Sequence, residues 1–156
     1  PNIIILTGFV TGGVARGILV GIVVTLVALF FTELNLHSFS ITIAIVLLTS
    51  IAFSLAGLIN AIFAEKFDDI AIIPTFVLTP LIYLGGVFYS IDMLPEFWQK
   101  VSAFNPILYM VNTFRYGMLG ESDINIFYAF AILIIFILIL FFISLHLLNK
   151  GTGIKN

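Results

Sequence analysis

Apolar residues fill four long stretches of this chain, and polar residues are concentrated in the gaps between them. The stretches cover residues 3–31, 41–64, 70–89 and 124–148, and the last three contain no Lys, Arg, Asp or Glu. A helix needs about 20 mostly apolar residues to cross the hydrocarbon core of a bilayer. The pattern therefore predicts four transmembrane helices.

The composition supports a lipid environment. Of the 156 residues, 62% are hydrophobic and 9% are charged, whereas soluble domains carry about 25% charged residues. A domain of this size cannot hide so much apolar surface in its interior. We expect an all-α, polytopic membrane protein with a single transmembrane domain over residues 1–156. The net charge of -2 and six scattered basic residues exclude a nucleic-acid surface, and the lack of cysteine excludes disulfides.

The charged residues between the stretches predict an orientation. The connection "EKFDD" contains Lys66, and the C-terminal tail contains Lys150 and Lys155. Basic residues favour the cytoplasmic side, so this connection and the C-terminus are predicted to be cytoplasmic. Residues 32–40 and 92–123 are then outside, although Lys100 and Arg115 weaken the asymmetry. Because the chain starts at Pro1 without a signal-peptide pattern, we expect it to be truncated at its N-terminus.

The first apolar stretch carries glycines at a four-residue spacing, at Gly13, Gly17 and Gly21. Small residues at this spacing let another helix approach closely, so the sequence predicts a packing face. Glycine is also simply common in membrane helices, and that explanation stays open. Arg16 lies in the same stretch; at mid-bilayer it would cost about 2.5 to 3.5 kcal/mol. We expect it near the inner edge, where its side chain reaches the headgroups.

The segment "LPEFWQKVSAFNPILYMVNTFRYGMLG" is the most polar long stretch between the apolar runs. It predicts two short helices, because Asn105 is a favourable N-cap and Pro106 suits the first helical position. The first has about three turns, with Phe97, Trp98, Val101 and Phe104 on its apolar face. The second has Ile107, Met110, Val111, Phe114 and Met118 on its apolar face, with Asn112 and Arg115 pointing elsewhere.

Neither short helix can cross a bilayer of about 30 Å. The pair over residues 92–120 forms either a hairpin on the outer surface or a re-entrant hairpin buried among the spanning helices. The buried arrangement requires that neighbouring protein satisfies the irregular backbone. Periodicity alone does not choose between the two.

The run "GGVFYSIDMLPEFWQKVSAFNPILYMVNTFRYG" resembles the C-terminal signature of ABC-2 type permeases, the membrane subunits of a class of bacterial ABC exporters. The resemblance extends upstream through "GGVARGILVGIVVTLVALFF" and "FSLAGLINAIFAEKFDDIAIIPTFVLTPLIYLGGVFYS" and covers essentially the whole chain. It implies a bacterial inner-membrane protein that contains the last four of six spans. It also implies a second permease copy and ATP-binding cassette partner subunits, which would bind ATP and Mg²⁺. This chain has no phosphate-binding Gly-Lys-Ser/Thr loop, so we expect no cofactor on it.

The resemblance also implies roles for individual residues. Asn105, Pro106, Tyr109 and Arg115 would mark a re-entrant hairpin that closes the outer end of the transport path. The four charged residues Glu65, Lys66, Asp68 and Asp69 would form a minor docking loop for the ATPase. From residue types alone, that loop is a solvated turn at the membrane boundary.

Three alternatives remain at the level of sequence. An ion-coupled carrier would need ionisable groups within the spans, and His146 is the one candidate apart from Arg16. An intramembrane enzyme would need a convergent catalytic set, which the sequence does not show, so we expect no enzymatic activity on this chain. The chain could also be an assembly factor or an inactive piece of a permease.

Overall fold

The computed structural model describes residues 1–151, which contain six α-helices, one short 3₁₀ helix and no β-strand. The order along the chain is α1 (Asn2–Ala28), α2 (Phe39–Phe63), α3 (Phe67–Tyr83), η1 (Ile91–Met93), α4 (Glu96–Ser102), α5 (Pro106–Leu119) and α6 (Ile126–Asn149).

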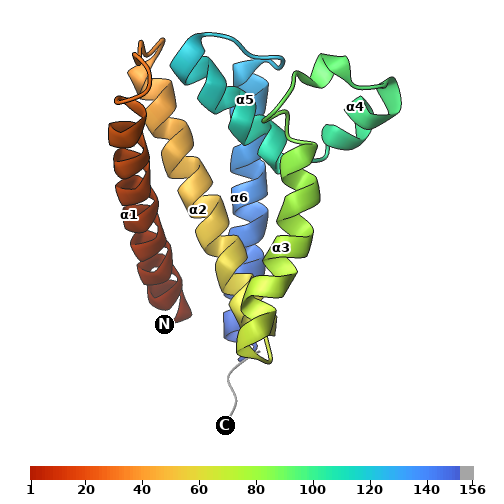
Figure 1. Cartoon of the computed structure of the whole chain (residues 1–156). Helices are drawn as coiled ribbons and strands as arrows, with labels where there is room; N and C mark the ends of the chain where they lie inside the picture. Colours follow the sequence, from red (N-terminus) through yellow and green to blue (C-terminus); the bar gives the residue numbers. More distant parts are fainter. Residues whose placement is uncertain (152–156) are drawn as a thin grey trace.

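Helix α2 is the centre of the bundle, since it packs against α1, α5 and α6 (Figure 1). The core lies where α2, α5 and α6 meet and consists of Ile45, Ala52, Ile107, Tyr109, Met110, Ala129 and Leu133. The N-terminus lies at the same end of the molecule as the last turn of α6. The side-chain amide of Asn2 donates to Asn149 Oδ1 at that end, over 2.8 Å. Within the structure, the two ends of the described chain therefore lie together.

Three helices within residues 1–151 are long and apolar enough to cross a membrane: α1, α2 and α6. The all-helical prediction is confirmed, but the structure does not confirm four spans. Helix α3 has 17 residues, which correspond to roughly 26 Å, and it ends six residues before the predicted boundary at 89. Gly85 and Gly86 follow its last turn, and Gly86 has a φ of 75° that favours glycine.

Helix α3 continues through Pro74, which has no N–H to donate to the carbonyl group of Ile70. The side-chain amide of Asn60, on α2, donates to that carbonyl oxygen instead, over 3.1 Å. A neighbouring helix thus restores the hydrogen bond that the proline removes. This bond also fixes the start of α3 against the end of α2.

Helices α1 and α2 pack through small residues. A Cβ on Gly17 would lie 2.2 Å from Ser50 Oγ, and one on Gly13 would lie 1.9 Å from Ser54 Oγ. These two glycines therefore lie where α2 approaches α1 most closely. At Gly21, the third glycine of the spacing, a Cβ would meet nothing within 4 Å among the described residues beyond its own helix.

Arg16 lies halfway along α1, 14 residues after Asn2 and 12 before Ala28. The helix is about 40 Å long, longer than a hydrocarbon core of about 30 Å, so the position of Arg16 at the inner edge of the membrane stays a prediction. Its exposed side chain leaves α1 beside the glycine contact.

Replacing Gly17 by Leu should destabilise the α1–α2 pair by about 1 to 3 kcal/mol, because the new side chain overlaps Ser50. The measurement is unfolding of the purified chain by SDS in mixed micelles, followed by circular dichroism. Gly21→Leu is the matched control, since its Cβ has open space. Equal stability of the two variants would contradict the packing geometry.

Candidate functional site at the break between α3 and α5

The candidate site is the place where α3 ends and α5 begins. Helix α5 starts beside the last turn of α3 and runs to the end of the molecule that lies away from the N-terminus (Figure 1). It packs against α2, α3 and α6. Half of its 14 residues are buried: Ile107, Leu108, Tyr109, Met110, Asn112, Thr113 and Gly117. The second arm of the predicted hairpin is thus an internal helix.

The last four carbonyl groups of α3 all accept hydrogen bonds, two from backbone N–H groups and two from side chains. The carbonyl oxygens of Pro80 and Ile82 accept from the backbone N–H groups of Leu84 and Gly85. The carbonyl oxygen of Leu81 accepts from Asn105 Nδ2 over 2.6 Å, and that of Tyr83 accepts from the Tyr89 hydroxyl. A helix end without such partners would be costly away from water.

Asn105 carries out two tasks with one side chain. Its Oδ1 atom accepts from the backbone N–H of Ile107 over 3.0 Å, which makes it the N-cap of α5. Its Nδ2 atom donates to Leu81, and the residue is 3% exposed. Pro106 follows at the first helical position, where a missing N–H leaves no orphan donor. This pair joins the end of α3 to the start of α5.

Tyr109 and Arg115 satisfy two further carbonyl groups. The Tyr109 hydroxyl donates to the carbonyl oxygen of Ala103 over 2.6 Å, at the end of α4. Its ring lies edge-on to that of Tyr128 on α6, with 6.2 Å between the ring centroids. Arg115 Nη2 donates to the carbonyl oxygen of Gly86. The predicted residues Asn105, Pro106, Tyr109 and Arg115 thus all lie at the start of α5 or along it, and the side chains of Asn105, Tyr109 and Arg115 bond to neighbouring segments.

Arg115 also takes part in a polar network that sequence reasoning missed. Its Nη1 atom lies 3.7 Å from Asp123 Oδ2, and these side chains are 24% and 19% exposed. The same carboxylate oxygen accepts from the backbone N–H of Ile91 over 3.2 Å. Asn112 Oδ1 accepts from the N–H of Asp123 over 3.0 Å, and Asn112 Nδ2 donates to Leu108. The network joins α5 to the segments before α4 and before α6.

Asn112 was expected to point away from the apolar face of its helix, and it is fully buried. The hydrogen-bond partners of Asn112, the N–H of Asp123 and the carbonyl oxygen of Leu108, lie inside the protein. The spacing of Asn112 and Arg115, three residues apart, was the available signal that they share a side of the helix.

The far end of α5 packs closely on the start of α2. A Cβ on Gly117 would lie 2.5 Å from Thr42 Oγ1. The backbone N–H groups of His37 and Ser38 donate to the carbonyl oxygens of Met118 and Gly117, over 3.2 and 2.9 Å. Helix α5 ends at Gly120, which has a φ of 80°. The break is therefore held at both ends of α5.

Helix α4 differs from α5 because its aromatic face is exposed. It has seven residues, about two turns, where the sequence predicted three. Phe97, Trp98 and Phe104 are 65%, 45% and 90% exposed. Lys100 pairs with Glu96 over 2.9 Å on the polar face. The hairpin thus has one buried arm and one exposed arm.

The predicted docking loop lies at the opposite end, where the chain passes from α2 to α3 (Figure 1). Asp69 Oδ2 accepts from the N–H groups of Glu65 and Lys66, over 3.2 and 3.1 Å. Its charge therefore stabilises the start of α3. The side chains of Glu65, Lys66 and Asp68 are exposed. Phe67, which the sequence analysis did not consider, is 88% exposed between them.

His146 lies in the last turn of α6 and is exposed. The sequence analysis considered it as an ionisable group within a span. Its position at the helix end removes the reason for that interpretation, since a residue there can reach the headgroup region.

Comparison with known proteins gives consistent matches. The family model described as "ABC-2 type transporter" matches residues 1–119. The whole chain is 49% identical to inner membrane transport permease YadH of Escherichia coli strain K12 and covers 61% of that protein. It is 29% identical over 106 residues to nodulation protein J of Rhizobium leguminosarum bv. viciae, matching 68% of this chain and 41% of that protein. No solved structure matches the chain significantly.

Replacing Asn105 by Ala should lower the free energy of unfolding by about 2 to 4 kcal/mol, because the N-cap is lost and the Leu81 carbonyl group stays buried without a donor. Asn125→Ala is the matched control. Asn125 caps α6 through the N–H of Tyr128, is exposed, and should lose only about 1 kcal/mol. SDS titration measures both; equal losses would show that the bond to Leu81 contributes nothing.

Proposed function

This chain belongs to the ABC-2 type transporter family, and we propose that it forms the membrane-spanning part of a permease subunit of an ABC exporter. The observation that carries the proposal is the 49% identity, along the entire chain, to an inner membrane transport permease. The apolar helices α1, α2 and α6 fit residence in a bacterial inner membrane. The chain covers about three fifths of that relative, so the function concerns the complete permease.

We propose that α3 and α5 together make the third of four crossings. Helix α3 is short for a bilayer, and α5 begins beside its last turn and continues to the far end of α2 (Figure 1). Two short helices with satisfied ends can replace one long helix where protein surrounds the break. Four crossings place both ends of the chain on one side, which the Asn2–Asn149 bond favours. Lys66 and Lys150 favour the cytoplasm for that side.

The break itself is proposed as the outer gate of the transport path. Buried α5 would move only with the segments bonded to it, whereas exposed α4 could move with less loss of packing. ATP binding and hydrolysis, on separate subunits that hold ATP and Mg²⁺, would bias the permease between inward-open and outward-open states. A second copy of the permease would complete the path.

The exposed loop between α2 and α3 is proposed to contact the ATP-binding subunit. Exposed Phe67 offers an apolar side chain between the charges of Lys66 and Asp68. Exposed large apolar side chains rimmed by polar groups are typical of protein interaction sites. Asp69 belongs to the internal cap of α3, so the docking contribution is expected from the other residues of the loop.

We expect the complete gene product to co-purify with an ATP-binding cassette subunit from its native membrane. The triple variant Glu65→Gln, Lys66→Gln, Asp68→Asn should lower the ATP hydrolysis of that complex at least about threefold, because the loop loses its charge complementarity. Asp69 is kept so that α3 retains its cap.

The matched control is Glu33→Gln, which removes an exposed charge in the loop between α1 and α2, at the opposite end of the molecule. This variant should retain the hydrolysis rate. A triple variant with the wild-type rate and wild-type co-purification would remove the α2–α3 loop from the proposed interface.

The orientation can be tested by labelling, because the chain contains no cysteine. Single substitutions Glu65→Cys and Glu96→Cys place one thiol at each end of the molecule. In intact spheroplasts, a membrane-impermeant maleimide should label Glu96→Cys and leave Glu65→Cys unlabelled until the cells are lysed. The reverse pattern would invert the proposed topology, and labelling of both thiols in intact cells would rule out that they lie on opposite sides.

A further inference from the structure

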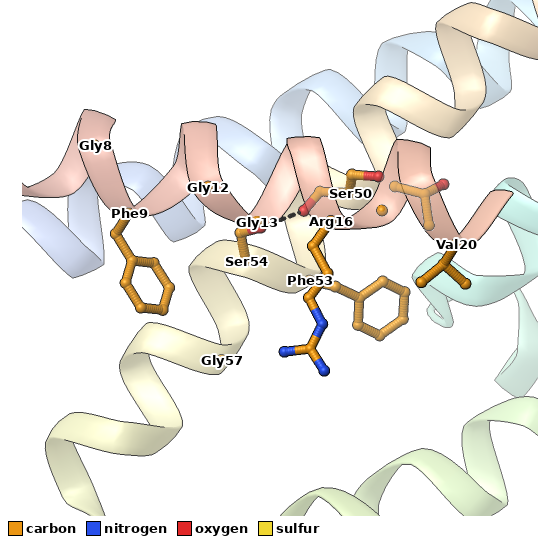
Figure 2. Close-up of a pocket in the computed structure, with 12 residues that line it drawn as sticks. Gly8, Phe9, Gly12, Gly13, Arg16, Val20, Ser50, Phe53, Ser54 and Gly57 are labelled. Atoms are coloured by element: carbon orange, nitrogen blue, oxygen red, sulfur yellow. Dashed lines mark hydrogen bonds between the residues drawn. The ribbon is translucent and has the colours of Figure 1, made fainter. Parts of the chain in front are cut away.

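A groove runs between α1 and α2, and Arg16 lines it. The groove has a volume of about 750 Å³. Figure 2 shows Phe9, Arg16 and Val20 leaving α1 on the side of the groove, with Phe53 and Gly57 coming from α2. Gly8 and Gly12 lie on its floor, and a Cβ on either would meet nothing within 4 Å among the described residues outside α1.

Arg16 is the one charged residue of α1. The helix is about 40 Å long at about 1.5 Å of rise per residue, and Arg16 lies 14 residues after Asn2 and 12 before Ala28. Within residues 1–151, the two ion pairs are Lys100–Glu96 and Arg115–Asp123, and Arg16 takes part in neither. A charged side chain within a membrane helix is paired or marks a path for a charged ligand.

Helices α1, α2 and α6 hold no acidic residue that could pair with Arg16, because all eight acidic residues of this sequence lie outside them. A second copy of these helices would bring another Arg16 and no carboxylate from them, so charge opposes pairing of two copies through this face. An occupant that carries its own negative charge would complement Arg16.

We propose that the groove binds an acidic amphiphile, with its phosphate or carboxylate on Arg16 and its apolar chain along the glycine floor. The guanidinium group suits this role because its planar fork of donors matches such anions. The hydroxyl groups of Thr49 and Ser50 line the groove beside it, and the rings of Phe9 and Phe53 supply apolar walls for the chain. Within an apolar helix, pairing makes the two charges tolerable together where either alone is unfavourable. The proposal concerns binding alone, so its test is independent of the test of export.

The test uses the purified chain in dodecyl maltoside and measures binding of dioleoyl phosphatidylglycerol and dioleoyl phosphatidylcholine by native mass spectrometry. The wild type should bind the anionic lipid at least about tenfold more tightly than the neutral one, as expected for a charge-assisted hydrogen bond. Arg16→Gln should abolish this preference, and Arg16→Lys should keep most of it. Lys150→Gln, which removes a positive charge at the end of α6, is the matched control and should change nothing.

Gly12→Leu gives an independent test, because it fills the floor of the groove in open space and leaves the α1–α2 contact intact. It should weaken phosphatidylglycerol binding about tenfold without changing the circular dichroism spectrum. Unchanged binding by Gly12→Leu or Arg16→Gln would overturn the proposal. Equal affinity of the wild type for the two lipids would overturn it too, and would favour an acidic protein helix as the occupant. If glycerol 3-phosphate displaces phosphatidylglycerol at concentrations equal to those of the lipid, the apolar chain contributes nothing to binding, and the proposal of an amphiphile is excluded.

Discussion

The arrangement of α3, α4 and α5 depends on one requirement: a helix that ends away from water must find donors for its last carbonyl groups within the protein. Helix α3 meets that requirement with side chains that come from later in the chain. Asn105 and Tyr89 donate to Leu81 and Tyr83, and Arg115 donates to Gly86 just beyond. The order of the whole segment between α3 and α6 follows from these bonds.

The same donors explain why α5 is internal and α4 is not. Several polar residues of α5 bond to backbone groups of other segments: Asn112 accepts from the N–H of Asp123, Tyr109 donates to Ala103 and Arg115 donates to Gly86. Moving α5 to the surface would break several of these bonds at once. Helix α4 has its ion pair between Glu96 and Lys100 on its own surface, and the bond from Tyr109 to Ala103 ties its end to α5. The stability of the two arms therefore differs along the hairpin.

Local patterns predicted much of this fold, because a run of apolar residues or an Asn-Pro pair acts within a few residues of itself. The start of α5 at Pro106 and the central parts of α1, α2 and α6 agree with the sequence prediction. The end of α3 at Tyr83 does not, since residues 84–89 stay apolar and hydropathy does not separate a spanning helix from a buried turn. The partnership of Arg115 with Asp123 is a tertiary contact that no local pattern contains.

The polar network also sets an order in which the protein can assemble. Helices α1 and α2 are neighbours in the chain and pack through residues 13–54 alone, so their contact is available as soon as α2 has been synthesised. The contact of Arg115 comes later, because Asp123 lies after α5 in the sequence and supplies the carboxylate that faces Arg115. During biogenesis, the network around α5 can therefore be completed only after the residues before α6 have emerged from the ribosome.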